Sequence, residues 1–120
     1  MGKTEVQATI IGEKETREYT FLVEGRTNFV GLPLEEIREL CLRPSLGQVR
    51  FMDPNDGWVE LDTYFANAEL LGTGISAILV PANHPFIGYG LLENRRFRIN
   101  STNQNVERVP DDEFHPPFLL

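Results

Sequence analysis

The sequence has few cysteines, few basic residues and no long hydrophobic run. Its 120 residues include one cysteine, Cys41, so no disulfide can form within the chain and nothing suggests a disulfide-stabilised secreted scaffold. Lysine and arginine total 11 against 18 acidic residues, and the net charge of -7 disfavours nucleic acids and anionic membranes as partners. No apolar run approaches the length of a membrane span, and the first residues lack the apolar core of a signal peptide. We therefore expect a cytoplasmic protein without a membrane partner.

What the sequence does contain is the composition of one folded domain. Hydrophobic residues make up 41% and charged residues 24% of the chain, which is ordinary for a globular protein and argues against disorder. A chain of 120 residues is long enough for one hydrophobic core and too short for two. We expect a domain over residues 1–109 and an extended tail over residues 110–120 (PDDEFHPPFLL) that lies on the surface or on a partner.

Most of the chain has the short alternating patterns of β-strands. Residues 5–11 (EVQATII) and 17–23 (REYTFLV) alternate apolar and polar side chains and predict a first hairpin. Residues 47–70 predict two strands around the turn DPNDG, residues 74–81 a compact apolar strand, and residues 99–109 a last hairpin. Short helices are expected after Pro33 and after Gly88. The pattern as a whole predicts an all-β, barrel-like domain with two short helices.

The clearest helix in the first half follows Pro33, in the segment LEEIRELCL. Proline suits the first turn of a helix, and the two acidic residues after Leu34 favour the positive end of the helix dipole. The apolar side chains fall on one helical face: Leu34, Ile37, Leu40 and Cys41. This placement predicts a buried, structural thiol at Cys41 and a helix that ends at Pro44.

Several local patterns look like chemical sites but are better explained as structure. DPNDGWVELD is similar to a calcium loop, yet its glycine comes one position early and Tyr64 stands where the bidentate glutamate belongs, so a hairpin turn is favoured. His84 and His115 are far apart, with no cysteine or carboxylate at ligand spacing. The basic cluster at residues 94–98 (NRRFR) is short and predicts a solvated face. We expect no metal and no cofactor.

An ordered pattern remains once these are set aside. An apolar strand ends in an acidic residue at a turn (FLV-Glu24-Gly25), and a proline-started helix follows (LP-LEEIRELCL). A strand–turn–strand with a glycine at its tip comes next (FMDPNDGWVEL), then a long apolar strand (ISAILVP) and the turn Phe86-Ile87-Gly88 into a short helix. This order resembles the retropepsin-like aspartic proteases, particularly their small single-lobe prokaryotic and archaeal members, over nearly the whole chain.

The resemblance implies a role for each segment. In that family the first strand pair leads to the catalytic Asp-Thr/Ser-Gly-Ala, a hydrophobic-hydrophobic-Gly turn packs beneath the catalytic loop, and the middle hairpin is a flap over the substrate. The catalytic loop aligns with Glu24, Gly25, Arg26 and Thr27, and the turn beneath it with Phe86, Ile87 and Gly88. The candidate flap residues are Met52, Asp53, Pro54, Asn55, Asp56, Gly57 and Trp58.

The same resemblance implies a homodimer. Peptide hydrolysis by this route needs two carboxylates that share one proton and activate one water, and their like charges split the pKa values of the pair. One lobe of this size supplies one such carboxylate. A two-fold dimer with its site on the axis is therefore implied.

The departure from the family pattern falls at the decisive loop. Glu24 carries one methylene more than aspartate, which displaces the carboxylate by roughly 1 Å, and such an error can cost about a hundredfold in rate. Gly25 removes the hydroxyl that braces the two loops across the axis. Arg26 replaces a glycine needed for close backbone approach, and a guanidinium beside Glu24 opposes a shared proton.

Two hypotheses follow from this departure. The first is a non-catalytic homodimer of retropepsin-like lobes that binds an extended peptide in its groove, or that serves as an assembly or regulatory module. The second is an atypical aspartic endopeptidase in which paired Glu24 carboxylates carry out the acid–base chemistry across the dimer axis.

Overall fold

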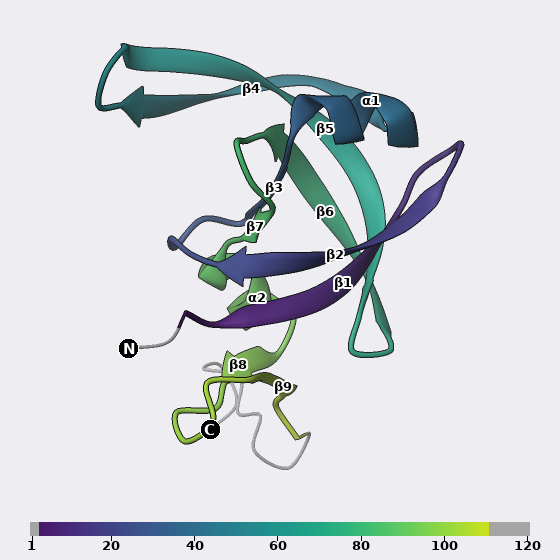
Figure 1. Cartoon of the computed structure of the whole chain (residues 1–120), viewed down its shortest axis with the longest axis vertical. Coiled ribbons are helices and arrows are strands. Elements are labelled where there is room, and N and C mark those ends of the chain that lie inside the picture. Colours follow the sequence, from purple (N-terminus) through teal and green to yellow (C-terminus); the bar gives the residue numbers. More distant parts are fainter. Residues whose placement is uncertain (1–2, 111–120) are drawn as a thin grey trace, which may run out of the picture.

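The computed structural model describes residues 3–110, which form mainly β-strands with two short helices (Figure 1). The strands are β1 (Glu5–Ile11), β2 (Thr16–Val23), β3 (Phe29–Leu32), β4 (Arg43–Asp53), β5 (Gly57–Leu70), β6 (Thr73–Pro81), β7 (Phe86–Ile87), β8 (Phe97–Ile99) and β9 (Val106–Arg108). The helices are α1 (Leu34–Leu40) and α2 (Tyr89–Asn94). The expectation of a mostly β domain with short helices after Pro33 and Gly88 is confirmed. The expected tail over residues 110–120 lies, apart from Pro110, outside the described residues.

The main sheet curls until it closes on itself. Its order is β1-β2-β7-β3-β6-β5-β4, and β1 also pairs with β5, so within residues 3–110 six strands form a closed ring and β4 hangs outside it. Closure satisfies the backbone groups that an open sheet leaves at its edges. The short β7 lies between β2 and β3, parallel to β2 and antiparallel to β3. This insertion brings the residues after β6 next to the end of β2.

The core fills this barrel with side chains from alternate strand positions. In β1 the buried side chains are Val6, Ala8 and Ile10, as the alternation predicts. Phe21 from β2 and Phe97 from β8 are the largest fully buried side chains. Leu91 and Leu92 close one end of the barrel from α2. Helix α2 therefore helps to bury the core beneath the β2–β3 loop.

Helix α1 is shorter than the sequence suggests, and the expectation for Cys41 was wrong. The helix ends at Leu40, and Cys41 adopts the left-handed conformation (φ 59°) that terminates it, with its thiol exposed. Leu42 takes the buried position instead. Pro44 does not end the helix but lies in β4, at the free edge of the sheet, where its missing N–H costs no ladder hydrogen bond.

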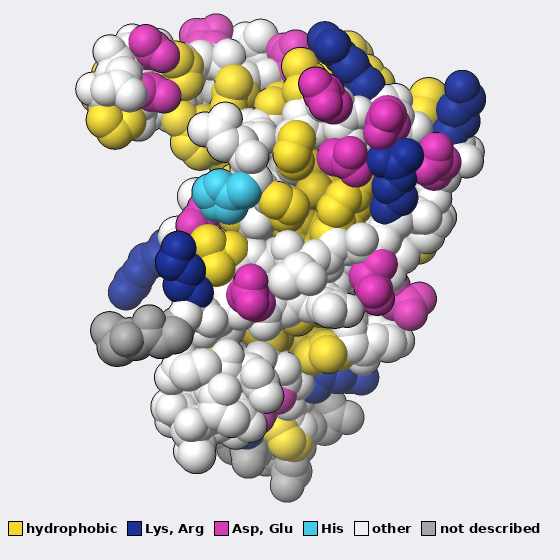
Figure 2. All heavy atoms as spheres, viewed as in Figure 1, with side chains coloured by type: hydrophobic (Ala, Val, Ile, Leu, Met, Phe, Trp, Pro, Cys, Tyr) yellow, Lys and Arg dark blue, Asp and Glu magenta, His cyan; other side chains and the backbone are white. Residues whose placement is uncertain are grey.

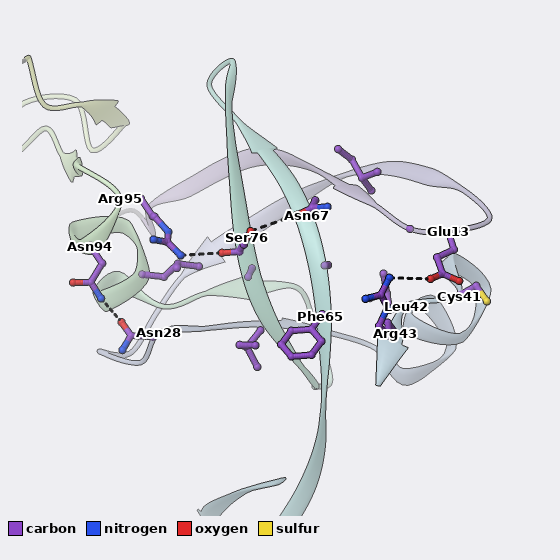
Figure 3. A pocket seen from close by; sticks show the side chains of 16 residues that line it. Glu13, Asn28, Cys41, Leu42, Arg43, Phe65, Asn67, Ser76, Asn94 and Arg95 are labelled. Atoms are coloured by element: carbon purple, nitrogen blue, oxygen red, sulfur yellow. Dashed lines mark hydrogen bonds and ion pairs between the residues drawn. The ribbon is translucent and has the colours of Figure 1, made fainter. Parts of the chain in front are cut away.

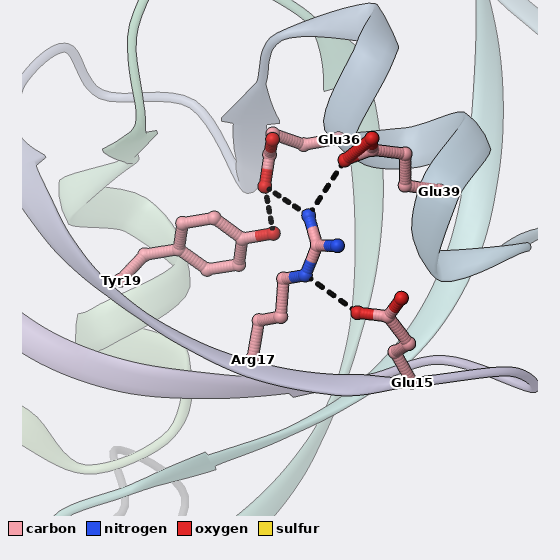
Figure 4. A network of polar contacts seen from close by, with 5 residues as sticks. All are labelled: Glu15, Arg17, Tyr19, Glu36 and Glu39. Atoms are coloured by element: carbon pink, nitrogen blue, oxygen red, sulfur yellow. Dashed lines mark hydrogen bonds and ion pairs between the residues drawn. The ribbon is translucent and has the colours of Figure 1, made fainter.

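A polar cluster fastens α1 to the first hairpin (Figure 4). The Arg17 guanidinium on β2 donates to Glu36 at 2.9 Å, Glu39 at 2.8 Å and Glu15 at 2.7 Å. The Tyr19 hydroxyl donates to Glu36 at 2.6 Å. The hydrogen bonds from Tyr19 and Arg17 hold the pKa of Glu36 below its ordinary value. Burial, together with the Glu36 carboxylate, raises the pKa of Tyr19. The cluster fixes the side of the barrel away from the β2–β3 loop.

The hairpin of β4 and β5 projects from the barrel as an arm, which we define as residues 48–62 (Figure 1). At its tip, the Asp53 carboxylate accepts hydrogen bonds from the N–H groups of Asn55 at 2.7 Å and Asp56 at 3.1 Å. Gly57 adopts φ +75°, a conformation that favours glycine. The expected hairpin turn over DPNDG is confirmed. Within residues 3–110 no group of three or more His, Cys, Asp or Glu side chains could hold a metal ion.

The expectations for the strand at 74–81, the last hairpin and the basic cluster agree with the structure. The strand at 74–81 and the last hairpin are present as β6 and as the β8–β9 pair. In the basic cluster the Arg95, Arg96 and Asn94 side chains are exposed, as expected. No helix in the described part of the chain has the length and apolar character needed to cross a bilayer.

Candidate functional site

The candidate site is the loop of residues 24–28, which connects β2 to β3. Glu24, Gly25 and Arg26 are exposed, and Gly25 turns the chain with φ +73°. Thr27 is half-buried beneath them. The loop therefore presents a carboxylate and a guanidinium to solvent from a sharp turn at the end of a core strand.

The turn between β7 and α2 holds this loop through backbone hydrogen bonds. The N–H of Glu24 donates to the Ile87 carbonyl at 3.1 Å, and the N–H of Tyr89 donates to the Gly25 carbonyl at 2.9 Å. The N–H of Gly88 donates to the Phe29 carbonyl at 2.9 Å, at the far end of the loop. The loop is thus bound on both sides of its tip, which gives Glu24 a fixed position in the barrel.

Glycines make this contact close. A Cβ at Gly88 would lie 2.0 Å from the Thr27 carbonyl oxygen, and one at Gly90 would lie 2.8 Å from the carbonyl oxygen of Arg26. The turn Phe86-Ile87-Gly88 was singled out from the sequence, whereas Gly90 was not. Its signal was the spacing Gly-x-Gly at the start of a helix, which by itself is weak.

The Glu24 carboxylate has a partner in its own chain. His84 Nε2 lies 2.7 Å from Glu24 Oε1, and the exposed fractions of the two side chains are 52% and 42%. The His84 ring also packs at a tilted angle against Phe86, with 6.4 Å between the ring centroids. The parallel pairing of β7 with β2, with Phe86 opposite Leu22, brings these segments side by side. The His84 side chain, two residues before Phe86, then reaches forward to Glu24, just past the end of β2.

The sequence predicts a different partner for Glu24, the guanidinium of Arg26. We expected the Arg26 guanidinium to act on this carboxylate, but Arg26 makes no ion pair with any residue in 3–110 and is exposed. His84 was considered only as a metal ligand, and its separation of 60 positions from Glu24 left no sequence signal of their contact. His115 lies outside the described residues.

The arm stands over the same side of the barrel. Figure 2 shows a hollow, here called the recess, between the projecting arm and the part of the body that carries the β2–β3 loop. One face of the arm is half-buried and apolar, with Val49, Phe51, Val59 and Leu61. Phe51 packs edge-on against Phe29 of β3, with 6.2 Å between the ring centroids. This contact joins the half-buried face of the arm to β3.

The candidate flap residues lie at the end of the arm, away from the loop. Met52 and Trp58 face outward and are 58% and 60% exposed, and the Arg50 guanidinium stacks on the Trp58 ring at 5.0 Å. In the described part of the chain no hydrogen bond or ion pair joins residues 52–58 to residues 24–27. The structure thus brings together the loop and the turn Phe86-Ile87-Gly88, and it keeps the arm tip apart from both.

The sequence matches no protein-family model and no curated protein sequence. The chemistry of the site is therefore read from its geometry alone. One carboxylate, hydrogen-bonded to one imidazole and open to solvent, can bind a cationic or hydrogen-bonding group. A second carboxylate to share a proton with Glu24 is not present beside it within residues 3–110.

Proposed function

We propose that this chain is a non-catalytic retropepsin-like lobe that forms a two-fold homodimer and holds an extended peptide in the recess. The proposal keeps the fold and the dimer that the family resemblance implies but excludes peptide hydrolysis by paired carboxylates. Each of its parts rests on a separate feature of the site.

The arrangement of the loop supports the retropepsin-like lobe. The family pattern requires a hydrophobic-hydrophobic-Gly turn beneath the loop that follows the second strand. Here Phe86-Ile87-Gly88 meets residues 24–28 through backbone hydrogen bonds and through the close approach of Gly88 to Thr27. The pattern also includes a hairpin between the helix and the last long strand, and the arm supplies one, although its tip does not contact the loop. Topology and contacts agree with the order of motifs in the sequence.

The hydrogen bond between Glu24 and His84 carries the conclusion that the lobe is non-catalytic. In an aspartic protease two carboxylates face one another and share one proton around one water. Glu24 instead directs Oε1 to His84 at 2.7 Å, within its own chain. An active site would require Glu24 to leave this partner and to meet a second Glu24 across an axis. Arg26, exposed on the same loop, would then stand next to that axis in both copies.

The recess supports an extended peptide as the ligand. The arm that borders the recess has an apolar face that remains only half-buried, and Phe51 of this face contacts Phe29 of β3. Apolar surface that is shaped into a groove and rimmed by polar groups is typical of peptide-binding sites. The polar rim here is the Glu24–His84 pair.

The first test is a peptidase assay. Wild type and Glu24→Gln are incubated with a diverse peptide mixture between acid and neutral pH, and products are read by mass spectrometry. Glu93→Gln, which changes an exposed glutamate on α2, is the matched control. We expect no cleavage by any of the three. Cleavage by wild type and Glu93→Gln that is lost in Glu24→Gln would establish the alternative, an endopeptidase with paired Glu24.

The second test addresses the dimer and the peptide. Sedimentation equilibrium is expected to give twice the chain mass, and a peptide selected from a random library is expected to protect the amides of the arm and of residues 24–28 from hydrogen exchange. A monomer at all concentrations would contradict the dimer. Protection confined to another face would contradict the recess as the binding site.

A further inference from the structure

A second groove, which we call the outer groove, crosses β5 and β6 (Figure 3). Its lining includes Asn28 of the β2–β3 loop but no residue of the arm. Its volume is about 690 Å³, within the range of ligand-binding sites. Helix α2 borders one end and the segment between α1 and β4 borders the other, as Figure 3 shows. The aliphatic and aromatic side chains that line it are Ile11, Leu42, Phe65, Ala66, Ala77, Ile78 and Leu91.

Two large apolar side chains are exposed on the floor of the outer groove. Phe65 is 48% exposed and Ile11 is 42% exposed, although both lie in strands of the closed ring. Ile11 pairs with Asn67, so Phe65, two positions along β5, is its diagonal neighbour on the same face of the sheet. Two large apolar side chains left this exposed in one groove make it a candidate binding surface. The surface therefore calls for an apolar occupant.

Basic groups mark the two ends. At the α2 end, Arg95 Nη2 donates to the Ser76 carbonyl at 3.2 Å and so lies along the groove. At the other end, Arg43 lies 3.8 Å from Glu13, a long and exposed ion pair. A segment that carries acidic residues before apolar ones would match this order from the α2 end.

The chain itself carries such a segment, and it starts beside that end. After β9, the N–H of Val109 donates to the Arg96 carbonyl at 2.8 Å, so the chain passes the residue after Arg95 as it leaves the described region at Pro110. Residues 111–120 follow, with three acidic residues (DDE) first and the apolar run FLL at 118–120. Their charge and apolar order match the order of the groove.

The segment is also long enough. Ten extended residues span about 33 Å. Crossing from β6 over β5 to β1 takes two strand spacings, about 10 Å. The residues FLL can therefore reach Phe65 and Ile11 with the acidic residues still near Arg95.

We propose that the outer groove is the docking site of this chain's own C-terminal segment, residues 111–120, with the aromatic and leucine side chains of 118–120 on Phe65 and Ile11. The outer groove contains no residue of the arm, and the proposal does not depend on peptide binding in the recess. Docking covers the exposed apolar floor within one chain.

The only cysteine provides a probe for this docking. Cys41 lines the outer groove and its thiol is exposed, so a nitroxide spin label can be attached there in the full-length chain. Amide signals of residues 118–120 are then compared before and after the nitroxide is reduced with ascorbate. We expect strong broadening by the nitroxide and recovery on reduction.

A matched pair of variants tests the floor. Phe65→Asp places a charge in the groove, whereas Leu71→Asp places one at an equally exposed apolar residue (49% against 48%) in the β5–β6 turn. We expect Phe65→Asp to restore the peak heights of residues 118–120 to those of the reduced sample and Leu71→Asp to leave the broadening unchanged. Leu119→Asp, which changes the segment and leaves the groove unaltered, is expected to act like Phe65→Asp and guards against a folding defect in the latter.

The outcomes that overturn the proposal are equally distinct. Peaks of 118–120 that are unbroadened in the wild-type chain, or broadening that survives both Phe65→Asp and Leu119→Asp, would show that the segment does not dock in this groove. Mixing spin-labelled unenriched chains with unlabelled ¹⁵N chains separates the two origins of the effect. Broadening in the mixture would show a second copy's segment as the occupant and would contradict docking within one chain.

Discussion

The two halves of β5 belong to different parts of the molecule, although they form one strand of 14 residues. In the barrel half, Ala66, Ala68 and Leu70 are buried and the residues between them are exposed. In the arm half, Val59 and Leu61 are only half-buried, and they lie on the opposite side of the strand from the buried residues of the barrel. The covered face thus switches at Thr63 and Tyr64. The same strand therefore runs from the barrel into the arm, but its fully buried side chains lie only in the barrel part.

This comparison predicts that barrel residues govern stability and arm residues do not, and the largest difference should come from Phe21. Its side chain is fully buried, so Phe21→Ala leaves a cavity and removes apolar contacts. We expect the free energy of unfolding to fall by about 4 kcal/mol. Urea denaturation followed by circular dichroism measures it. A loss below that of an arm substitution would break the comparison.

The close contact beneath the loop gives the next effect. In Gly88→Ala the new methyl group meets the Thr27 carbonyl oxygen at 2.0 Å, so the loop or the turn has to move. We expect a loss of about 3 kcal/mol in the same denaturation experiment. Gly74→Ala in β6 is the control, because nothing lies within 4 Å of its added Cβ. Equal stability of the two variants would show that residues 24–28 are not held by the turn.

A smaller, pH-dependent effect is expected at the α1 cluster. Tyr19→Phe removes the hydrogen bond to Glu36 and should cost about 1 kcal/mol at neutral pH, since the cluster is partly exposed. Tyr19 and Arg17 lower the pKa of Glu36 in the folded chain. The stability that this carboxylate contributes is therefore complete above its unfolded pKa and is lost as the pH falls through the lower, folded value.

The difference in unfolding free energy between wild type and Tyr19→Phe should accordingly shrink in acid. Denaturation curves at a series of pH values check this, with Tyr89→Phe as a control because no hydrogen bond of its hydroxyl is present among the described residues. A gap that stays constant from neutral pH into acid would mean that Tyr19 stabilises the fold without Glu36.

The smallest effect belongs to the arm. Trp58 is 60% exposed and contacts the Arg50 guanidinium, so Trp58→Ala should change the free energy of unfolding by about 0.5 kcal/mol or less. Thermal unfolding followed by far-ultraviolet circular dichroism measures the change without relying on the lost indole. A loss comparable to that of Gly88→Ala would show that the arm contributes to stability as much as the barrel does.

The sequence predicts the barrel better than it predicts the site. Alternation marked β1 and β2, turn residues marked Asp53 to Gly57, and a proline marked the start of α1, because each of these signals is local. The parallel pairing of β2 with β7 is not local; only the family resemblance indicated that Phe86-Ile87-Gly88 packs beneath the loop, and it did not indicate the strand register. The contact of His84 with Glu24 depends on that pairing, which is why the sequence suggested Arg26 instead.

The prediction of a buried thiol at Cys41 was wrong for a different reason. Helical spacing placed it on the apolar face, but the helix stops one residue earlier, and a residue in the left-handed conformation no longer follows helical spacing. The retropepsin-like identity, the homodimer and the peptide ligand remain predictions that the experiments above can test.

The bulge at the base of the arm has a mechanical consequence. The residues between Pro44 and Gln48 of β4 interrupt its pairing with β5, and Leu46 there has φ 67° and is almost fully exposed. Thr63 of β5 holds the loop together by hydrogen bonds to Ser45 and to the Gly47 carbonyl. Strand β5 therefore enters the arm without interruption, whereas β4 is interrupted by the bulge at the base of the arm. The Thr63 hydroxyl links the two strands at this interruption, so the attachment of the arm depends on one side chain there as well as on the continuous strand.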